Sequence, residues 1–161
     1  MLNEVELEHL RRAVGLARAA RARGNHPFGA ILVGADGQVL AEAENSVVTT
    51  GDCTGHAELN LVRLTSTQYD QKTLRGSTLY TSTEPCAMCA GAIYWCGIGK
   101  VVFALSEERL YMLTGADRAN EAMRLPCRDV FACCGRTIAV DGPALEVEAE
   151  EVHIGFWQAG A

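Results

Sequence analysis

Basic residues are few in this chain of 161 residues, where 14 lysines and arginines stand against 20 aspartates and glutamates and give a formal net charge of −6. Proteins that bind nucleic acid usually carry a basic patch, because contacts to phosphate supply most of the affinity. The sequence therefore argues against a nucleic-acid partner and favours a small neutral substrate. A cluster of arginines near the N-terminus fits a solvated helix face: Arg11, Arg12, Arg18, Arg21 and Arg23.

A long uncharged apolar run is also missing near the N-terminus. Charged residues occur throughout Met1 to Arg23, and the apolar residues among them recur at helical spacing. This pattern is typical of neither a signal peptide nor a transmembrane segment, so we expect a cytoplasmic protein without a membrane partner. No internal repeat appears, and the length with 48% apolar residues predicts a single domain over residues 1–161.

Only one pair of the seven cysteines, Cys86 and Cys89, has the C-x-x-C spacing. Cytoplasmic cysteines are expected to stay reduced, which excludes a disulfide framework. The other five are interpreted as small core or surface residues, although Cys53 lies close enough to His56 to reach a pocket rim: Cys53, Cys96, Cys127, Cys133 and Cys134. A second metal site built from Cys127, Cys133 and Cys134 is an alternative.

The most informative feature is the combination of His56-Ala57-Glu58 with Cys86 and Cys89 about thirty residues later. One imidazole and two thiols make three soft metal ligands, and the carboxylate of Glu58 is left over. Structural zinc sites close all four tetrahedral positions with protein atoms, whereas hydrolytic sites keep three protein ligands and leave the fourth for water. The pattern therefore predicts a catalytic site for one zinc ion per subunit.

The spacing indicates where these ligands lie in the secondary structure. Residues two apart on a helix do not share a face, so His56 must lie at or before the first turn of the helix that carries Glu58, with Thr54 and Gly55 as expected capping residues. Pro85 suits a helix start, which puts Cys86 and Cys89 on one face of a first turn. The partial positive charge at a helix N-terminus favours the thiolates that zinc requires.

Three other interpretations of these residues are open. The C-x-x-C pair alone fits a redox dithiol, and a lone histidine fits a hydrogen-bonded core residue. A non-catalytic, zinc-stabilised binding module is a further alternative. A redox pair gives no role to His56 or Glu58, and a structural zinc site requires a fourth protein ligand, so the joint pattern favours catalysis.

Alternating strand and helix patterns predict an α/β fold, a three-layer α/β/α sandwich. After an N-terminal helix, residues 28–33 and 38–44 form a hairpin across Ala35-Asp36-Gly37, and a helix covers about 55–67. Residues 77–81 and 100–105 are strands around a helix at about 86–96. Further on we expect a helix at 107–113, a loop or short helix at 115–120, a fifth strand at 137–140, and a helix from Pro143 towards Phe156 and Trp157.

The H-x-E and P-C-x-x-C signature, with Pro27-Phe28-Gly29-Ala30, Asn45 and the stretch from Leu79 to Trp95, resembles the cytidine and deoxycytidylate deaminase superfamily over about residues 9–117. The resemblance implies a five-stranded mixed sheet. It makes His56, Cys86 and Cys89 zinc ligands, and Glu58 the group that moves protons between water and substrate. Within the superfamily the sequence is most similar to the bacterial guanine deaminase branch.

That branch implies further substrate-binding residues. Asn45 would bind the base, and Asp117 would contact the amino and ring NH groups of a purine. Ala57 and three aromatic residues complete the set: Phe28, Trp95 and Phe156. The sequence departs from the branch in two places. A longer segment around 125–142 leaves the path of the C-terminal tail open. Cys53 and Gly55 replace the residues that are usual beside the zinc histidine.

The resemblance thus implies a zinc-dependent hydrolase that releases ammonia from a free nucleobase, with guanine as the expected substrate in purine metabolism. Cytosine, isocytosine or an aminotriazine is the alternative substrate, and a tRNA adenosine deaminase comes third because the chain is acidic. The face Ala87, Ala90, Gly91 and Tyr94 permits close helix packing, either within the core or between subunits. Because related deaminases are commonly dimers or tetramers, the resemblance implies a homodimer.

Overall fold

The computed structural model describes residues 2–114 and 122–157, and its centre is a five-stranded sheet in the order β2-β1-β3-β4-β5. The strands are β1 (Gly29–Val33), β2 (Val39–Glu44), β3 (Thr78–Thr83), β4 (Lys100–Leu105) and β5 (Ala139–Asp141). β1 pairs antiparallel with β2 and β3, whereas β3, β4 and β5 run parallel. The sheet is therefore mixed, as expected, although the fifth strand begins at Ala139.

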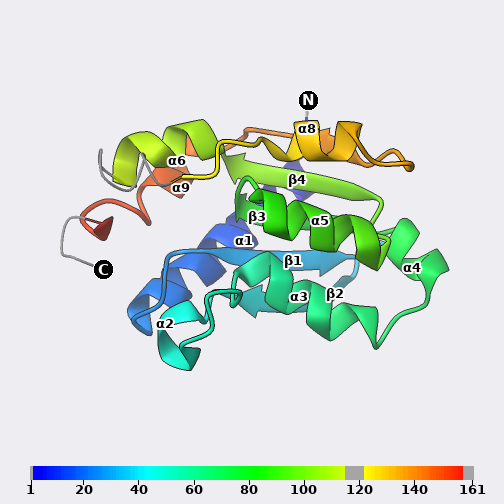
Figure 1. Cartoon of the computed structure of the whole chain (residues 1–161), viewed down its shortest axis with the longest axis horizontal. Helices are drawn as coiled ribbons and strands as arrows, with labels where there is room; N and C mark the ends of the chain where they lie inside the picture. Colours follow the sequence, from blue (N-terminus) through cyan, green and yellow to red (C-terminus); the bar gives the residue numbers. More distant parts are fainter. Residues whose placement is uncertain (1, 115–121, 158–161) are drawn as a thin grey trace.

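Helices cover both faces of this sheet (Figure 1), with α1 (Glu4–Ala22) on one face and α3 (Ala57–Ser66) and α5 (Ala87–Cys96) on the other. Side chains alternate along β1, as they do along any strand. Ala30 and Leu32 belong to the core beneath α3 and α5. Ile31 and Val33 belong to the core beneath α1. The expected three-layer sandwich is confirmed.

Five shorter helices join these layers in the part of the chain that the structure describes. They are α2 (Val47–Thr50), α4 (Gln71–Arg75), α6 (Glu107–Thr114), α8 (Cys127–Ala132) and α9 (Glu146–Glu150). The periodicity predicts α6 but not α2, α4 or α8, because four to six residues are too few to show a helical repeat. Among the described helices, none is long and apolar enough to cross a membrane.

The prediction of one C-terminal helix from Pro143 to the Phe156-Trp157 pair is wrong. The helix α9 spans only Glu146–Glu150, and the residues after it form successive turns. Leu145 before α9 and Gly155 after it both have positive φ angles, 62° and 73°. Since a left-handed residue does not continue a right-handed helix, the backbone turns at both positions.

One edge of the sheet collects the residues that matter for function. Antiparallel pairing places the start of β1 beside the ends of β2 and β3, through the pairs Gly29 with Glu44 and Ala30 with Thr81. The helices α3 and α5 also begin at this edge, as the ribbon shows (Figure 1). Residues directly before β1, after β2 and after β3 are therefore neighbours in space.

Candidate metal centre and active site

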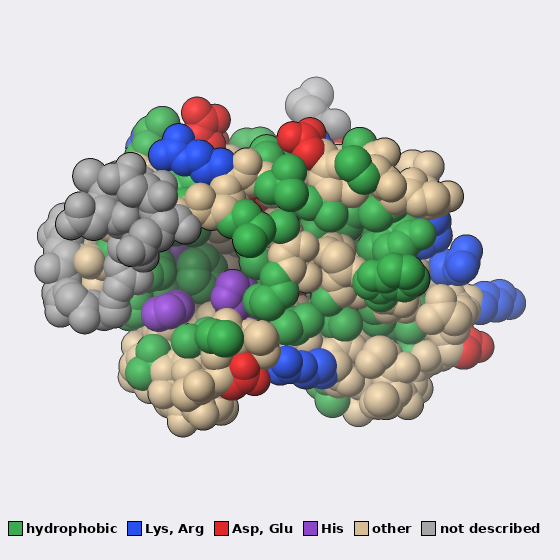
Figure 2. Space-filling view, viewed as in Figure 1, with side chains coloured by type: hydrophobic (Ala, Val, Ile, Leu, Met, Phe, Trp, Pro, Cys, Tyr) green, Lys and Arg blue, Asp and Glu red, His purple; other side chains and the backbone are tan. Residues whose placement is uncertain are grey.

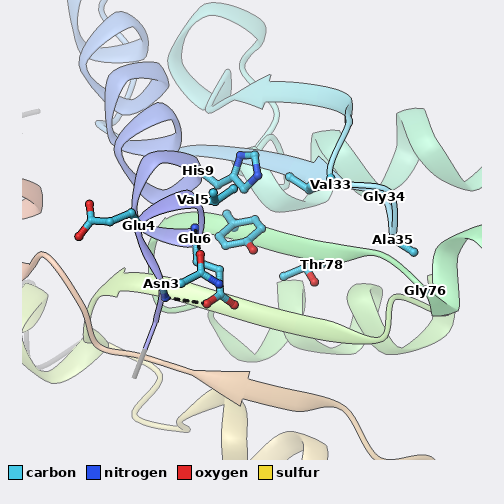
Figure 3. Close-up of a pocket in the computed structure, with 12 residues that line it drawn as sticks. Asn3, Glu4, Val5, Glu6, His9, Val33, Gly34, Ala35, Gly76 and Thr78 are labelled. Carbon is cyan, nitrogen blue, oxygen red and sulfur yellow. Dashed lines mark hydrogen bonds between the residues drawn. The ribbon is translucent and has the colours of Figure 1, made fainter.

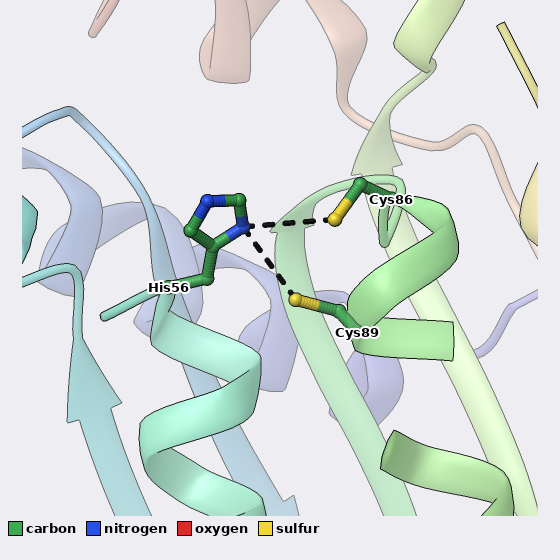
Figure 4. A group of neighbouring side chains, drawn as sticks. All are labelled: His56, Cys86 and Cys89. Atoms are coloured by element: carbon green, nitrogen blue, oxygen red, sulfur yellow. Dashed lines mark hydrogen bonds between the residues drawn. The ribbon is translucent and has the colours of Figure 1, made fainter. Parts of the chain in front are cut away.

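His56, Cys86 and Cys89 meet at this edge of the sheet. The Nδ1 atom of His56 lies 3.6 Å from the Sγ atom of Cys86 and 3.6 Å from that of Cys89. All three donor atoms lie within 4.8 Å of one another, and the imidazole faces both sulfurs (Figure 4). A nitrogen and a sulfur bound to one tetrahedral zinc are about 3.6 Å apart, because the Zn–N and Zn–S distances are about 2.1 and 2.3 Å. The donor set therefore fits zinc.

Two helix starts hold these ligands, as the spacing predicts. His56 is the N-cap residue of α3 and Cys86 is the N-cap residue of α5, both with extended backbone. The expected capping role of Thr54 and Gly55 is wrong, because no side chain caps α3. Gly55 packs so closely that a Cβ atom there would lie 2.8 Å from the Oγ atom of Ser46. Backbone N–H groups of both first turns thus remain available to favour negative charge at the site.

The two thiols differ in their acidity. A hydrogen bond from Cys89, assisted by His56, lowers the pKa of Cys86 to about 4. The same bond to Cys86, together with burial, raises the pKa of Cys89. The contact with Cys86 also raises the pKa of His56. The site therefore already stabilises one thiolate, which is the form in which cysteine binds zinc.

Glu58 lies on the first turn of α3, two residues after His56, and is only 5% exposed. Its Oε1 atom accepts a hydrogen bond of 2.8 Å from the Oγ1 atom of Thr81 on β3. Burial raises the pKa of Glu58, and the nearby charge of Cys86 raises it further. A buried carboxyl beside the metal ligands with a raised pKa is suited to accept and release protons during catalysis.

Asn45 follows β2, in a segment that is bonded to the residue before His56. The next residue, Ser46, donates its backbone N–H to the carbonyl of Gly55 at 2.8 Å, which joins the two segments. The Oδ1 atom of Asn45 accepts from the backbone N–H of Val47 at 3.1 Å, as in a turn. Its Nδ2 atom is buried without a hydrogen-bond partner among the described residues. A buried donor of this kind is costly to leave unpaired, so it indicates a place for a ligand acceptor.

An aromatic cluster lies next to Asn45, whose backbone N–H bonds the carbonyl of Phe28 at 3.0 Å. The ring of Phe28 lies 5.4 Å from that of His153 and 6.1 Å from that of Trp157. Phe156 contacts Trp157 edge-on at 4.8 Å. The structure therefore brings Phe28 and Phe156 to the same group, which adjoins the metal centre through Asn45.

Three expected site residues remain: Ala57, Trp95 and Asp117. Ala57 is the first residue of α3 and is fully buried. Trp95 is 82% exposed, and it lies six residues after Cys89 on α5, about 9 Å further along the helix axis. The structure therefore does not bring Trp95 to the metal ligands of its own chain. Asp117 lies outside the described residues.

The sequence interpretation missed three polar residues around the site. Thr81, described above, contacts Glu58. Glu84, two residues before Cys86, accepts backbone hydrogen bonds from Glu107 at 3.2 Å and Cys127 at 3.1 Å. Glu107 is 6% exposed, and burial raises its pKa to about 7. Each is distant in sequence from its partner, so no local pattern identifies the contact.

A second hollow and the remaining cysteines were the other candidates for a functional site. A hollow at the opposite edge of the sheet is lined by residues that include Asn3, Glu6, His9 and Tyr80 (Figure 3), where the Glu6 carboxylate accepts from the Asn3 backbone at 3.0 Å. Within residues 2–114 and 122–157, no second group of His, Cys, Asp and Glu side chains can hold a metal. The alternative metal site at Cys127, Cys133 and Cys134 is therefore wrong. On the face in Figure 2, histidine side chains lie in a hollow and hydrophobic side chains gather over α5.

Comparison with known proteins agrees with this chemistry. The family model of the cytidine and deoxycytidylate deaminase zinc-binding region matches residues 3–105. A probable cytosine deaminase from Schizosaccharomyces pombe is 44% identical over 160 residues, which covers 99% of this chain and 96% of that protein. A tRNA-specific adenosine deaminase from Haemophilus influenzae is 37% identical over 105 residues, which covers 65% of this chain and 61% of that protein.

Among solved structures, the X-ray structure of guanine deaminase from Bacillus subtilis is similar over 99% of this chain and 96% of that chain. It has a TM-score of 0.62 and 32% sequence identity. The three relatives have different substrates in their names but the same type of reaction.

Proposed function

This chain belongs to the cytidine and deoxycytidylate deaminase family, with zinc as its cofactor, and we propose that it is a hydrolytic deaminase of a free nucleobase or related amino-heterocycle. In this proposal His56, Cys86 and Cys89 hold the zinc ion. Glu58 transfers protons, and Asn45 binds the base. Ala57, Phe28 and Phe156 form walls around the base, and Asp117 reads its ring NH and amino groups.

One observation carries the proposal. Three donor atoms lie at the spacing of a single tetrahedral zinc, and the only acidic side chain two residues from the histidine is Glu58, which is buried against Thr81 rather than turned to solvent. A site with three protein ligands and an adjacent carboxyl is the arrangement that hydrolysis requires. Neither a redox pair nor a closed structural zinc site needs Glu58.

In the proposed reaction, Glu58 transfers protons and Asn45 binds the base. When bound, zinc would supply the nucleophile by activating a water molecule for addition to the carbon that bears the amine. Glu58 would accept the proton that the water loses as its oxygen bonds to that carbon, and would deliver it to the neighbouring ring nitrogen. It then assists proton transfer to the departing amine, which leaves as ammonia. Asn45 donates through Nδ2 to an exocyclic carbonyl oxygen of the base, because its Oδ1 atom already accepts from Val47.

We propose guanine as the substrate, on the resemblance to the bacterial guanine deaminase branch and the similarity to the Bacillus subtilis structure. Cytosine is the second candidate, because the Schizosaccharomyces pombe relative matches nearly the whole chain, including the aromatic C-terminal segment. Both bases carry an amine on a carbon next to ring nitrogen and a carbonyl oxygen that Asn45 Nδ2 can bind.

The charges on α1 favour a free base over a tRNA substrate. Three arginines of α1 and its C-cap residue Arg23 form ion pairs with carboxylates: Arg11 with Glu148, Arg12 with Glu42, Arg18 with Glu151 and Arg23 with Glu44. Paired arginines in a chain of net charge −6 make a weak phosphate-binding surface.

The function is tested by incubating the purified zinc-loaded protein with guanine, cytosine, isocytosine, ammeline and adenosine-containing tRNA, and measuring ammonia. We expect ammonia from guanine, with xanthine as the second product, or else from cytosine with uracil. Ammonia release from tRNA alone would replace the free-base assignment. No ammonia from any of the five, with zinc bound, would favour a non-catalytic binding module.

Asn45→Asp tests the base-binding role without disturbing the turn. Aspartate keeps the oxygen that accepts from Val47 but lacks the Nδ2 donor, so we expect normal folding and a fall in kcat/KM of about 10- to 100-fold, mostly through KM. Steady-state kinetics and a thermal melt measure the two effects. A kcat/KM within about threefold of wild type would remove Asn45 from the substrate contacts.

We also propose a homodimer, through a face of α5 that overlaps the one the sequence suggests at Gly91 but is shifted around the helix. Ala90 of the expected face is fully buried in the core of its own chain. Ala87, Gly91 and Tyr94 of that face are half-buried. Met88, Ala92 and Trp95, which are exposed or half-buried at helical spacing, form an adjacent stripe together with Gly91. Trp95 and Met88 are 82% and 37% exposed, and hydrophobic side chains gather on this face (Figure 2). A second copy would cover this apolar stripe.

Light scattering at micromolar concentration is expected to give twice the mass of one chain. Trp95→Glu, which places a charge at the most exposed residue of the stripe, is expected to give monomers. Val147→Glu is the matched control, since Val147 is also exposed, at 75%, but lies on α9. A monomeric wild type, or a Trp95→Glu protein that stays dimeric, would contradict the proposed interface.

A further inference from the structure

Thr81 is a buried residue of β3 whose hydroxyl reaches the proposed proton-transfer group. Its side chain is fully buried, and its Oγ1 atom lies 2.8 Å from Oε1 of Glu58. Two backbone carbonyls are also within reach, that of Thr83 at 3.1 Å and that of Gly29 at 3.5 Å. A hydroxyl carries one proton, so it donates to a single acceptor at a time. The carboxylate is the nearest of the three and accepts the strongest bond.

The contact joins two elements that have little freedom to move. β3 lies inside the sheet, paired with β1 on one side and β4 on the other. Successive side chains of a strand point to opposite faces, so Thr81 faces the layer of α3 while Tyr80 faces α1. The hydroxyl is therefore a fixed point from which the Glu58 side chain, at the mobile end of three rotatable bonds, can be oriented.

We infer that Thr81 is a positioning residue for Glu58: its hydroxyl occupies Oε1 of the carboxylate and leaves proton exchange with water and substrate to Oε2. This inference rests on the proposed function, because it assumes that Glu58 moves protons. The hydroxyl of Thr81 lies within bonding distance of Glu58 and of two backbone carbonyls, and we assign it no contact with the metal ligands or the substrate, so it acts only through Glu58. A carboxylate held in one orientation spends less time in unproductive ones, and small misplacement of such groups costs up to about 100-fold in rate.

Thr81→Val tests the inference, because valine has nearly the same shape and no hydroxyl. With the base that gives the fastest ammonia release in the substrate panel, we expect kcat to fall about 10- to 100-fold, with KM within about threefold and one zinc retained per chain. Thr81→Ser keeps the hydroxyl and is expected to recover kcat to within about threefold of wild type. If the valine variant does not fold, Thr81→Ala is judged by the same criteria.

Thr65→Val is the matched control. Thr65 is also fully buried, lies on α3 like Glu58, and donates its hydroxyl to the carbonyl of Leu61 at 2.8 Å. Its loss removes one buried hydrogen bond from the same helix without touching Glu58, so we expect unchanged kcat. If Thr65→Val lowered kcat as much as Thr81→Val, the effect would be structural and the inference would be wrong.

Two further measurements separate this inference from the proposed function. In a Glu58→Gln background, Thr81→Val is expected to cause no additional loss of the residual rate. A crystal structure of the folded Thr81→Val protein is expected to show the Glu58 carboxylate rotated away from its wild-type position. Full kcat in Thr81→Val, together with an inactive Glu58→Gln, would overturn the role of Thr81 alone. Full activity in Glu58→Gln would overturn the proposed function itself.

Discussion

Glu58→Gln is expected to keep one zinc ion per chain and to lose turnover by about 10²- to 10⁴-fold, the usual contribution of a positioned acid and base. Glutamine has the same shape and can still accept the hydrogen bond from Thr81, which in the wild type is 2.8 Å long. It cannot take a proton from water at neutral pH. The loss is therefore expected in kcat, with little change in the thermal midpoint.

The measurement combines ammonia release under saturating substrate with metal analysis of the same preparation. Glu107→Gln is an informative comparison, because the Glu107 side chain is also buried, at 6% exposure, but has no proton-transfer role in the proposal; its backbone N–H donates to Glu84. A much smaller fall in kcat is expected for it. Retained turnover in Glu58→Gln would show that another group moves the protons.

Cys86→Ala is expected to lose both zinc and turnover. The variant leaves only His56 and Cys89 as donors, and removal of a direct ligand is expected to weaken zinc binding by more than about 100-fold, the upper range for loss of a supporting contact. It also removes the thiol whose pKa lies at about 4, and with it the thiolate that the site stabilises. Zinc content by mass spectrometry after dialysis measures the effect.

Cys133→Ala provides the matched control for the cysteine prediction. Cys133 is an exposed cysteine at the end of α8, outside the group of metal donors. Its loss is expected to leave one zinc per chain and full ammonia release. Zinc retained in Cys86→Ala, or lost equally in Cys133→Ala, would contradict the assignment of the ligands.

The parts of the fold that the sequence predicts are those with a repeating local pattern. Apolar residues at strand spacing in 100–105 predict β4 with its observed bounds, Lys100–Leu105. The helical repeat after His56 predicts α3 to within a residue or two. The C-terminal segment could not be predicted in this way, because its path depends on left-handed backbone at Leu145 and on packing of Trp157 against Phe28, which is distant in sequence.

The same distinction applies to the site. The convergence of His56 with Cys86 and Cys89 could be predicted, because each ligand is placed by its own helix start and the ligand chemistry restricts how they combine. The hydrogen bond from Thr81 to Glu58 could not, since strand alternation gives the face of Thr81 but not the helix residue opposite. Trp95 is a further example, because it was expected in the pocket. It lies near the end of α5, far along the helix axis from Cys89, and is 82% exposed.

X-ray absorption at the zinc edge of the purified protein counts the atoms bound to the metal, and so tests whether zinc has three protein ligands and a free position for water. We predict one zinc per chain, with two sulfur atoms at about 2.3 Å, one imidazole nitrogen at about 2.0–2.1 Å and one oxygen from solvent. A fourth donor from the protein, either sulfur or nitrogen, would make the site structural and would contradict deamination at this centre.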